Sequence, residues 1–328
     1  SDNADILAGD TDANTLSGGG GDDTFYGSGG GDTYYGGISG SDSGTDTVSY
    51  IGAGAGVDAS LIDGGTGGLA TGDSYDGIEN LIGSDYADIL TGDSSDNVFT
   101  GGDGGDTLVG GAGSDTASYA TAGPVDGVDE GVTAVLVSDF GDLQTGDAAG
   151  DQFDSIENLV GSDYNDVLYG DSGSNVLSGG LGDDKLYGLG GADELYGEAG
   201  DDTLHVNQGE DTVVSGGADT DTIELHGLTA SYDLAPLAAK VDSVEILDIA
   251  DGVDTEITIT SQDILNMLDG GTDPLTIQAD GGDSLVISLS GTETYNPNDP
   301  GPISPVDGTI YTISDGATTV AQVQWEIV

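Results

Sequence analysis

A nine-residue repeat constrains the fold of this chain more than any other feature. The pattern is G-G-x-G-x-D-x-U-x, in which U is a large apolar residue. Its clearest copies are Gly18–Tyr26, Gly101–Val109 and Gly179–Tyr187. A unit this short buries its apolar side chain only against its neighbours, so repeats of this kind stack into one quasi-one-dimensional array.

The repeats fall into three blocks, at residues 1–49, 83–118 and 161–224. The sixth positions hold Asp5, Asn14, Asp23, Asp32 and Asp46 in the first block, Asp88, Asn97, Asp106 and Asp115 in the second, and Asp166, Asn175, Asp184, Asp193, Asp202, Asp211 and Asp221 in the third. The apolar positions two residues later hold Leu7, Leu16, Phe25 and Tyr34, then Leu90, Phe99 and Leu108, then Leu168, Leu177, Leu186, Leu195, Leu204, Val213 and Ile223.

Each unit divides into a turn and a very short strand. The glycines permit positive φ in the turn, and the central side chain of x-U-x points to one side of the strand. Two units then make one coil, so positions eighteen residues apart stack along the same edge. Asp5 with Asp23, Asp88 with Asp106, Asp166 with Asp184, and Asp193 with Asp211 have this separation. The pattern predicts an all-β fold, a right-handed parallel β-roll or β-solenoid.

Stacked carboxylates of this kind predict calcium sites between adjacent turns. Calcium takes 6–8 oxygen ligands, from carboxylates and backbone carbonyls. We expect the sixth-position Asp residues to be ligands, with Asn14, Asn97 and Asn175 as neutral ligands. Turn carbonyls complete the predicted sites, at Gly18, Gly20, Gly101, Gly179 and Gly188. The same-edge pairs and the end sites together predict roughly nine to thirteen Ca²⁺ ions.

The charge balance favours a fold that depends on cations. The 328 residues include 62 acidic and only 2 basic residues, for a net charge of -60. Such self-repulsion opposes a compact state. Asp outnumbers Glu by 51 to 11, which suits turns and hard-cation sites. The absence of Cys excludes disulfides and thiolate metal sites, and two lysines cannot form a phosphate-binding patch for nucleic acid.

The segments between the blocks are also repeated. Both contain a Ser-Tyr, a short alternating run (Val57–Ile62 and Val132–Val137), a TGD and an IENL sequence. We interpret them as longer coils, so that residues 1–225 form one solenoid.

Residues 226–328 lack the nonapeptide and are predicted to form a mainly-β capping domain. Strands are expected at Val244–Ile249, Glu256–Thr260, Leu275–Gln278, Ser284–Leu289, Thr309–Ser314 and Thr319–Ile327, with one helix at Ile264–Leu268. Asp248, Asp251, Asp254, Asp280 and Asp283 are interpreted as surface acids, with a further ion site as the alternative.

The block pattern SY…GV…IENL…GSDYxDxLxGD resembles the RTX regions of type I-secreted bacterial proteins. The tail, VDSVEILDIADG followed by ITITSQDILNMLDGG, is similar to the C-terminal region of large RTX adhesins. The resemblance implies calcium as the cofactor, a type I secretion channel as a partner, and a place outside the cell or on its surface, as for biofilm adhesins. No apolar run approaches the ~18 residues of a membrane helix, so no membrane insertion is expected. We expect a monomeric segment of a longer chain.

The sequence predicts no enzyme activity. His205 and His226 lie in no H-E-x-x-H setting, and no G-x-S-x-G motif is present. His205 occupies a ninth position, where a residue on the outer face of a strand is expected. Two alternatives stay open: a targeting module for a secreted protease, lipase or polysaccharide-modifying enzyme, and a surface-layer module.

Overall fold

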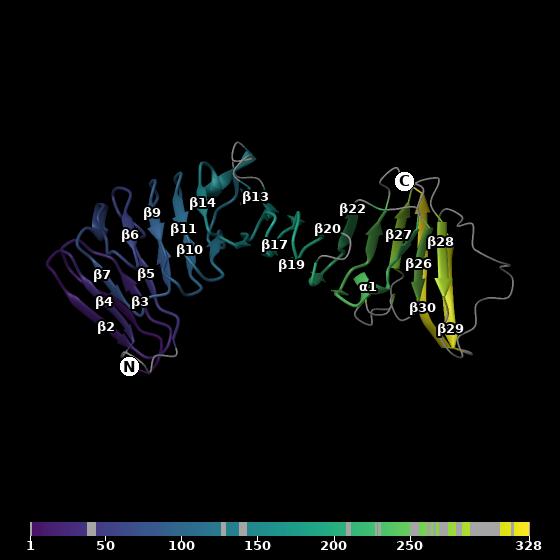
Figure 1. Cartoon of the computed structure of the whole chain (residues 1–328), viewed down its shortest axis with the longest axis horizontal. Coiled ribbons are helices and arrows are strands. Elements are labelled where there is room, and N and C mark those ends of the chain that lie inside the picture. Colours follow the sequence, from purple (N-terminus) through teal and green to yellow (C-terminus); the bar gives the residue numbers. More distant parts are fainter. Residues whose placement is uncertain are drawn as a thin grey trace. The chain divides into compact units, whose positions relative to one another are not determined.

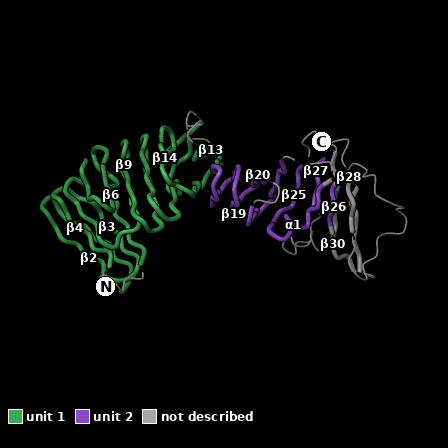
Figure 2. Tube along the Cα trace, viewed as in Figure 1, with its two compact units in different colours: residues 1–170 green, residues 171–328 purple. Residues whose placement is uncertain are grey.

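The computed structural model describes residues 2–37, 44–125, 129–137, 143–207, 211–226, 228, 231–249, 256–260, 264, 267–268, 275–279, 284–288, 309–315 and 318–327. The chain divides into two compact units, residues 1–170 and 171–328 (Figure 2). Short β-strands dominate both units (Figure 1).

Unit 1 contains sixteen described strands. They are β1 (Ile6–Ala8), β2 (Thr15–Gly19), β3 (Thr24–Tyr26), β4 (Thr33–Gly37), β5 (Thr47–Ser49), β6 (Asp58–Ser60), β7 (Ser74–Asp76), β8 (Asn80–Ile82), β9 (Ile89–Thr91), β10 (Val98–Thr100), β11 (Thr107–Val109), β12 (Thr116–Ser118), β13 (Glu130–Val135), β14 (Gln152–Asp154), β15 (Asn158–Val160) and β16 (Asn165–Tyr169). Two 3₁₀ turns, Gly68–Ala70 and Gly146–Ala148, lie in the two longer coils.

Parallel pairing in unit 1 follows the coil repeat. One sheet has the order β1-β3-β5-β8-β10-β12-β15, and others have the orders β2-β4-β7 and β6-β9-β11-β14. Leu7 pairs with Phe25, and Leu90 with Leu108, so residues eighteen apart are in register. Each coil contributes one strand to the long sheet and one strand to one of the other sheets, which is the predicted β-solenoid.

The core is the row of inward-facing apolar residues. Phe25, Val48, Leu81 and Phe99 follow one another along the first sheet and are fully buried. Burying one such side chain contributes about 1.5–3 kcal/mol. Leu7, which pairs with Phe25, is half-buried.

Unit 2 continues the same design. Its strands are β17 (Val176–Leu181), β18 (Lys185–Tyr187), β19 (Glu194–Ala199), β20 (Thr203–Asn207), β21 (Val213–Ala218), β22 (Thr222–His226), β23 (Ser231–Asp233), β24 (Val241–Asp242), β25 (Ile246–Asp248), β26 (Glu256–Thr260), β27 (Leu275–Ala279), β28 (Ser284–Ser288), β29 (Thr309–Asp315) and β30 (Thr318–Ile327), with the short helix α1 (Ala235–Ala238). Within this unit the sheets run β17-β19-β21-β24, β18-β20-β22-β25-β27-β30-β29 and β23-β26-β28.

The tail carries the expected strands, and parallel stacking extends into it. β25, β27 and β30 add in register to β22, whereas β29 pairs antiparallel with β30 at the edge. Of the predicted helix, Ile264 and Met267 are helical and Leu268 lies in a turn, whereas residues 265 and 266 lie outside the described residues. α1 was not predicted from the sequence, although Pro236 in its first turn is a known start signal.

One apolar assignment is wrong. Val214, not Val213, faces the core opposite Leu195. An extra residue separates the strand from Asp211, and the amides of Thr212 and Val213 both point to the carbonyl of Asp193. The alternation of inward-facing and outward-facing side chains along the strand is therefore displaced by one residue.

Candidate metal centres

The sixth-position side chains lie where each turn enters its strand. One carboxylate oxygen accepts a hydrogen bond from the backbone N–H of the sixth residue in the preceding coil. These contacts are Asp5 N to Asp23 (2.7 Å), Asn14 N to Asp32 (2.8 Å), Asp23 N to Asp46 (2.7 Å), Asp88 N to Asp106 (2.8 Å), Asn97 N to Asp115 (2.8 Å), Asn175 N to Asp193 (2.9 Å), Asp184 N to Asp202 (2.8 Å) and Asp202 N to Asp221 (3.0 Å). The predicted rows of Asp and Asn are thus aligned along the coils.

The second carboxylate oxygen of many of these residues has no hydrogen-bond donor. Among the described residues this holds for buried oxygens of Asp23, Asp106, Asp115, Asp193, Asp202, Asp211 and Asp221. A buried charged oxygen without a partner is strongly unfavourable. With only two lysines in the chain, protein cations cannot neutralise these rows.

Glycine at the first position makes room for this oxygen. A Cβ at Gly18 would lie 1.7 Å from Asp23 Oδ2, and one at Gly101 would lie 2.1 Å from Asp106 Oδ2. The same holds for Gly179 with Asp184 (2.2 Å) and Gly188 with Asp193 (2.4 Å). Only a residue without a side chain leaves room for this oxygen beside the turn backbone. Gly20 lies in the turn between β2 and β3.

Electrostatics in the rows favours an added positive charge. Burial, together with the charges of neighbouring carboxylates, raises the pKa of Asp106, Asp193 and Asp221 to about 7. Burial raises the pKa of Asp166 and Asp202 to about 6. Without a cation the raised pKa favours the protonated, neutral form of these groups. A cation bound beside them favours the charged carboxylate instead.

The chemistry of these sites suits a hard divalent cation. Carboxylate and amide oxygens stand beside turn carbonyls, and the described rows contain no imidazole or thiolate. Calcium accepts this set of ligands in irregular geometry. The residues present therefore fit Ca²⁺.

Two aspartates of the rows, Asp73 and Asp151, were not predicted from the sequence. Asp73 accepts the N–H of Asp32, and Asp151 accepts the N–H of Asp106. A signal was present, because Asp73-Ser74-Tyr75 and Asp151-Gln152-Phe153 repeat the D-x-U spacing. The TGD at 145–147 is not equivalent to the TGD at 71–73. It overlaps the 3₁₀ turn, and Gly150-Asp151 takes the equivalent place.

In these two longer coils a tyrosine hydroxyl donates a hydrogen bond to the second carboxylate oxygen, which has no donor at the other row positions described above. Tyr50 donates to Asp73 Oδ2, and Tyr119 donates to Asp151 Oδ2, both at 2.7 Å. Both tyrosines are buried, which raises their pKa well above the usual value. The Ser-Tyr sequences thus satisfy a row carboxylate with a protein donor.

Glutamate and serine complete the rows at other coil joints. Glu79, Glu157 and Glu245 accept the N–H groups of Asp46, Asp115 and Asp221. Each of these Glu residues stands two positions before a buried Leu, in the two IENL sequences and in the similar VEIL sequence. The sixth-position Asp has the same spacing to its apolar residue. Ser84 and Ser162 hydrogen-bond the carboxylates of Asp88 and Asp166 through backbone and hydroxyl groups.

A family model described as the RTX calcium-binding nonapeptide repeat (four copies) matches residues 1–37, 76–117, 153–186, 178–213 and 187–223. The chain carries RTX calcium-binding repeats. The matched RTX segments contain most of the carboxylate rows described above, and the two tyrosine-satisfied carboxylates lie outside them. No curated protein matches the chain significantly. Among the described residues, none of the helices has the length and apolar character needed to cross a bilayer.

Two expectations from the sequence stay predictions. The assignment of individual Asp, Asn and Gly residues as calcium ligands is one, and the absence of enzyme activity is another. Asp251, Asp254, Asp280 and Asp283 lie outside the described residues, whereas Asp248 lies on β25. His205 faces outward, but Tyr187 and His226 stack on it and leave it only 9% exposed.

Replacement of Tyr119 by Phe is expected to destabilise unit 1 in excess calcium. The change leaves Asp151 Oδ2 buried without its donor, which costs about 1–3 kcal/mol. Urea denaturation followed by circular dichroism measures the shift. Tyr86→Phe, at a side chain that is 49% exposed, is the matched control. Equal midpoints for the two variants would contradict the assigned role of the hydroxyl.

Proposed function

We propose that this chain is the calcium-dependent folding and secretion module of an extracellular RTX adhesin. Proteins with RTX repeats are typically exported by type I secretion and act outside the cell. The similarity of the tail to RTX adhesins supports the adhesin assignment over the alternatives. In this proposal residues 1–225 are the calcium-binding solenoid, and residues 226–328 act as the cap and secretion signal region.

The carboxylate oxygens that are buried without donors carry the proposal. A fold that leaves them without a counter-charge is favourable only when cations occupy the turns. Extracellular calcium modules bind with dissociation constants of about 10⁻⁴–10⁻³ M, far above free cytosolic calcium. The chain therefore stays open inside the cell and folds outside, where the binding free energy of roughly nine to thirteen ions becomes folding free energy.

Folding that begins only outside the cell suits export through a narrow channel. An open, self-repelling chain passes through the channel, and calcium traps each part that emerges. Growth of the solenoid coil by coil opposes backward movement.

A calcium titration of the whole chain tests the proposal. Strand content by circular dichroism is expected to rise with a midpoint between about 10⁻⁴ and 10⁻³ M Ca²⁺, and Mg²⁺ should not replace calcium. A midpoint below micromolar calcium would place folding inside the cell and contradict the proposal.

Single substitutions test whether the carboxylate rows set the calcium midpoint of folding. Asp106→Asn and Asp193→Asn each remove one charge, and Asn already stands at the sixth position in three units. Both variants are expected to need severalfold more calcium. Asp63→Asn, at an exposed residue outside the repeat blocks, should not change the midpoint.

The alternatives differ in what accompanies the module. A surface-layer module would form lattices in calcium, which light scattering detects. A targeting module would be joined to a catalytic domain in the secreted protein, which mass spectrometry of that protein would reveal.

A further inference from the structure

The outer face of unit 2 carries a row of aromatic and acidic side chains unlike the calcium rows. Tyr187, His205 and Glu224 stand in register on the adjacent strands β18, β20 and β22. His226 follows Glu224 by two residues, so both side chains leave β22 on the same face. This group lies on the strands, away from the turns that hold the carboxylate rows.

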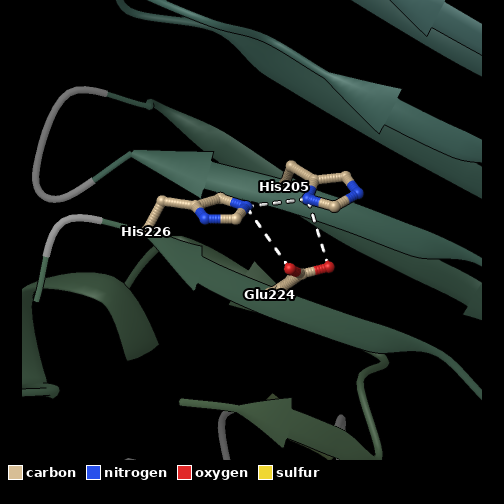
Figure 3. A group of neighbouring side chains, drawn as sticks. All are labelled: His205, Glu224 and His226. Carbon is tan, nitrogen blue, oxygen red and sulfur yellow. Dashed lines mark hydrogen bonds and ion pairs between the residues drawn. The ribbon is translucent and has the colours of Figure 1, made fainter. Parts of the chain in front are cut away.

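The three side chains converge on a common point. His205 Nδ1 lies 2.9 Å from His226 Nε2 and 3.3 Å from Glu224 Oε2, and His226 Nε2 lies 3.6 Å from Glu224 Oε1. Figure 3 shows one ring nitrogen of each histidine directed at the other and at the carboxylate. All three ligand atoms lie within 4.8 Å of one another.

We propose that His205, Glu224 and His226 bind a first-row transition metal ion such as Zn²⁺. Two imidazole nitrogens at about 2.0–2.1 Å from one ion lie about 2.9–3.4 Å apart at bond angles of about 90–110°. The observed separation between His205 Nδ1 and His226 Nε2, 2.9 Å, lies at the lower end of this range. Imidazole nitrogen suits Zn²⁺, Ni²⁺ and Cu²⁺, whereas calcium requires oxygen ligands. The site therefore selects a different class of ion from the carboxylate rows.

The surroundings suit a bound metal ion. Stacking of Tyr187 on His205, with ring centroids 3.7 Å apart, fixes the orientation of the imidazole. Glu224 and His226 are 38% and 48% exposed, which leaves one side open for water ligands. The ion would join β20 to β22 and so cross-link two successive coils.

Zinc uptake by the whole chain, folded in millimolar calcium and free of any histidine tag, tests the site. Equilibrium dialysis with metal analysis is expected to find one tightly bound Zn²⁺ per chain, which excess calcium does not displace. Histidine ¹H–¹⁵N correlation spectra should shift at His205 Nδ1 and His226 Nε2. No tight zinc binding in excess calcium, or unshifted histidine spectra, would overturn the proposal.

Variants localise the ion. His205→Phe retains the stacking on Tyr187 and removes the ligand nitrogen, and His226→Phe removes the second one. Each is expected to weaken zinc binding at least ~10-fold, since even second-shell losses cost ~10–100-fold. Glu194→Gln is the matched control, at a Glu that flanks a buried Leu on β19. Unchanged zinc affinity in both histidine variants would reject the site. Unchanged calcium-induced folding in them would show that the proposed calcium-dependent folding does not depend on the zinc site.

Discussion

Withdrawal of calcium at pH 7.5 is expected to unfold the entire chain. At ten times its dissociation constant each ion contributes about 1.4 kcal/mol to the folded state. Roughly nine such ions give about 13 kcal/mol, which is comparable with the 5–15 kcal/mol of total stability usual for a domain. The net charge of -60 then opposes any compact state without compensation.

Circular dichroism and small-angle scattering measure this unfolding. In excess chelator the strand signal should disappear, and the radius of gyration should reach at least ~65 Å, the value for an unfolded chain of this length. Return of calcium should restore both quantities, and magnesium should restore neither. Persistence of the strand signal in chelator would show that the rows tolerate their charge without an ion.

Acidification in the absence of calcium is expected to restore part of the fold. The pKa of Asp106, Asp193 and Asp221 is about 7 in the folded, metal-free chain, against about 3.9 when unfolded. Between these values the folded state binds more protons, so its stability rises as pH falls from 8 to 5. The gain is lost again as pH rises through about 7.

Strand content in calcium-depleted buffer between pH 8 and pH 5 measures this gain. A proton on each buried oxygen takes the place of the cation by removing the charge. The triple variant Asp106→Asn, Asp193→Asn, Asp221→Asn removes three of the titrating groups and should flatten the pH profile, whereas Asp63→Asn should not. An unchanged random-coil spectrum down to pH 5 would contradict the expectation.

The repeat determined most of the fold in advance. Period, coil length and register all follow from the sixth-position Asp and the apolar residue two positions later, as the pairing of Leu7 with Phe25 confirms. The position of Val214 could not be predicted, because a single extra residue beside Asp211 changes which side chains face inward without changing the motif. Local spacing does not reveal such a shift.

The members of the rows that were not predicted lie outside the three repeat blocks. Asp73, Asp151 and Glu245 stand at equivalent places, but they follow coils of different length, or replace Asp by Glu. The pairing of Tyr50 with Asp73 joins residues 23 apart in sequence, a contact that only the stacked coils bring together. His205, Glu224 and His226 were missed as a group for the same reason.

The hydrogen bonds along the rows have a direction. In the sixth-position contacts described above, the backbone N–H of one coil donates to a side chain of the coil that follows it, as with Asp88 and Asp106. The backbone N–H of Thr107, in the later coil, donates in turn to the carbonyl of Asp88. Each junction between coils therefore uses acceptors from both sides, a side-chain carboxylate of the later coil and a backbone carbonyl of the earlier one. The array is polar in the way that a filament is, so a coil stacked in the reverse direction would match neither set of acceptors.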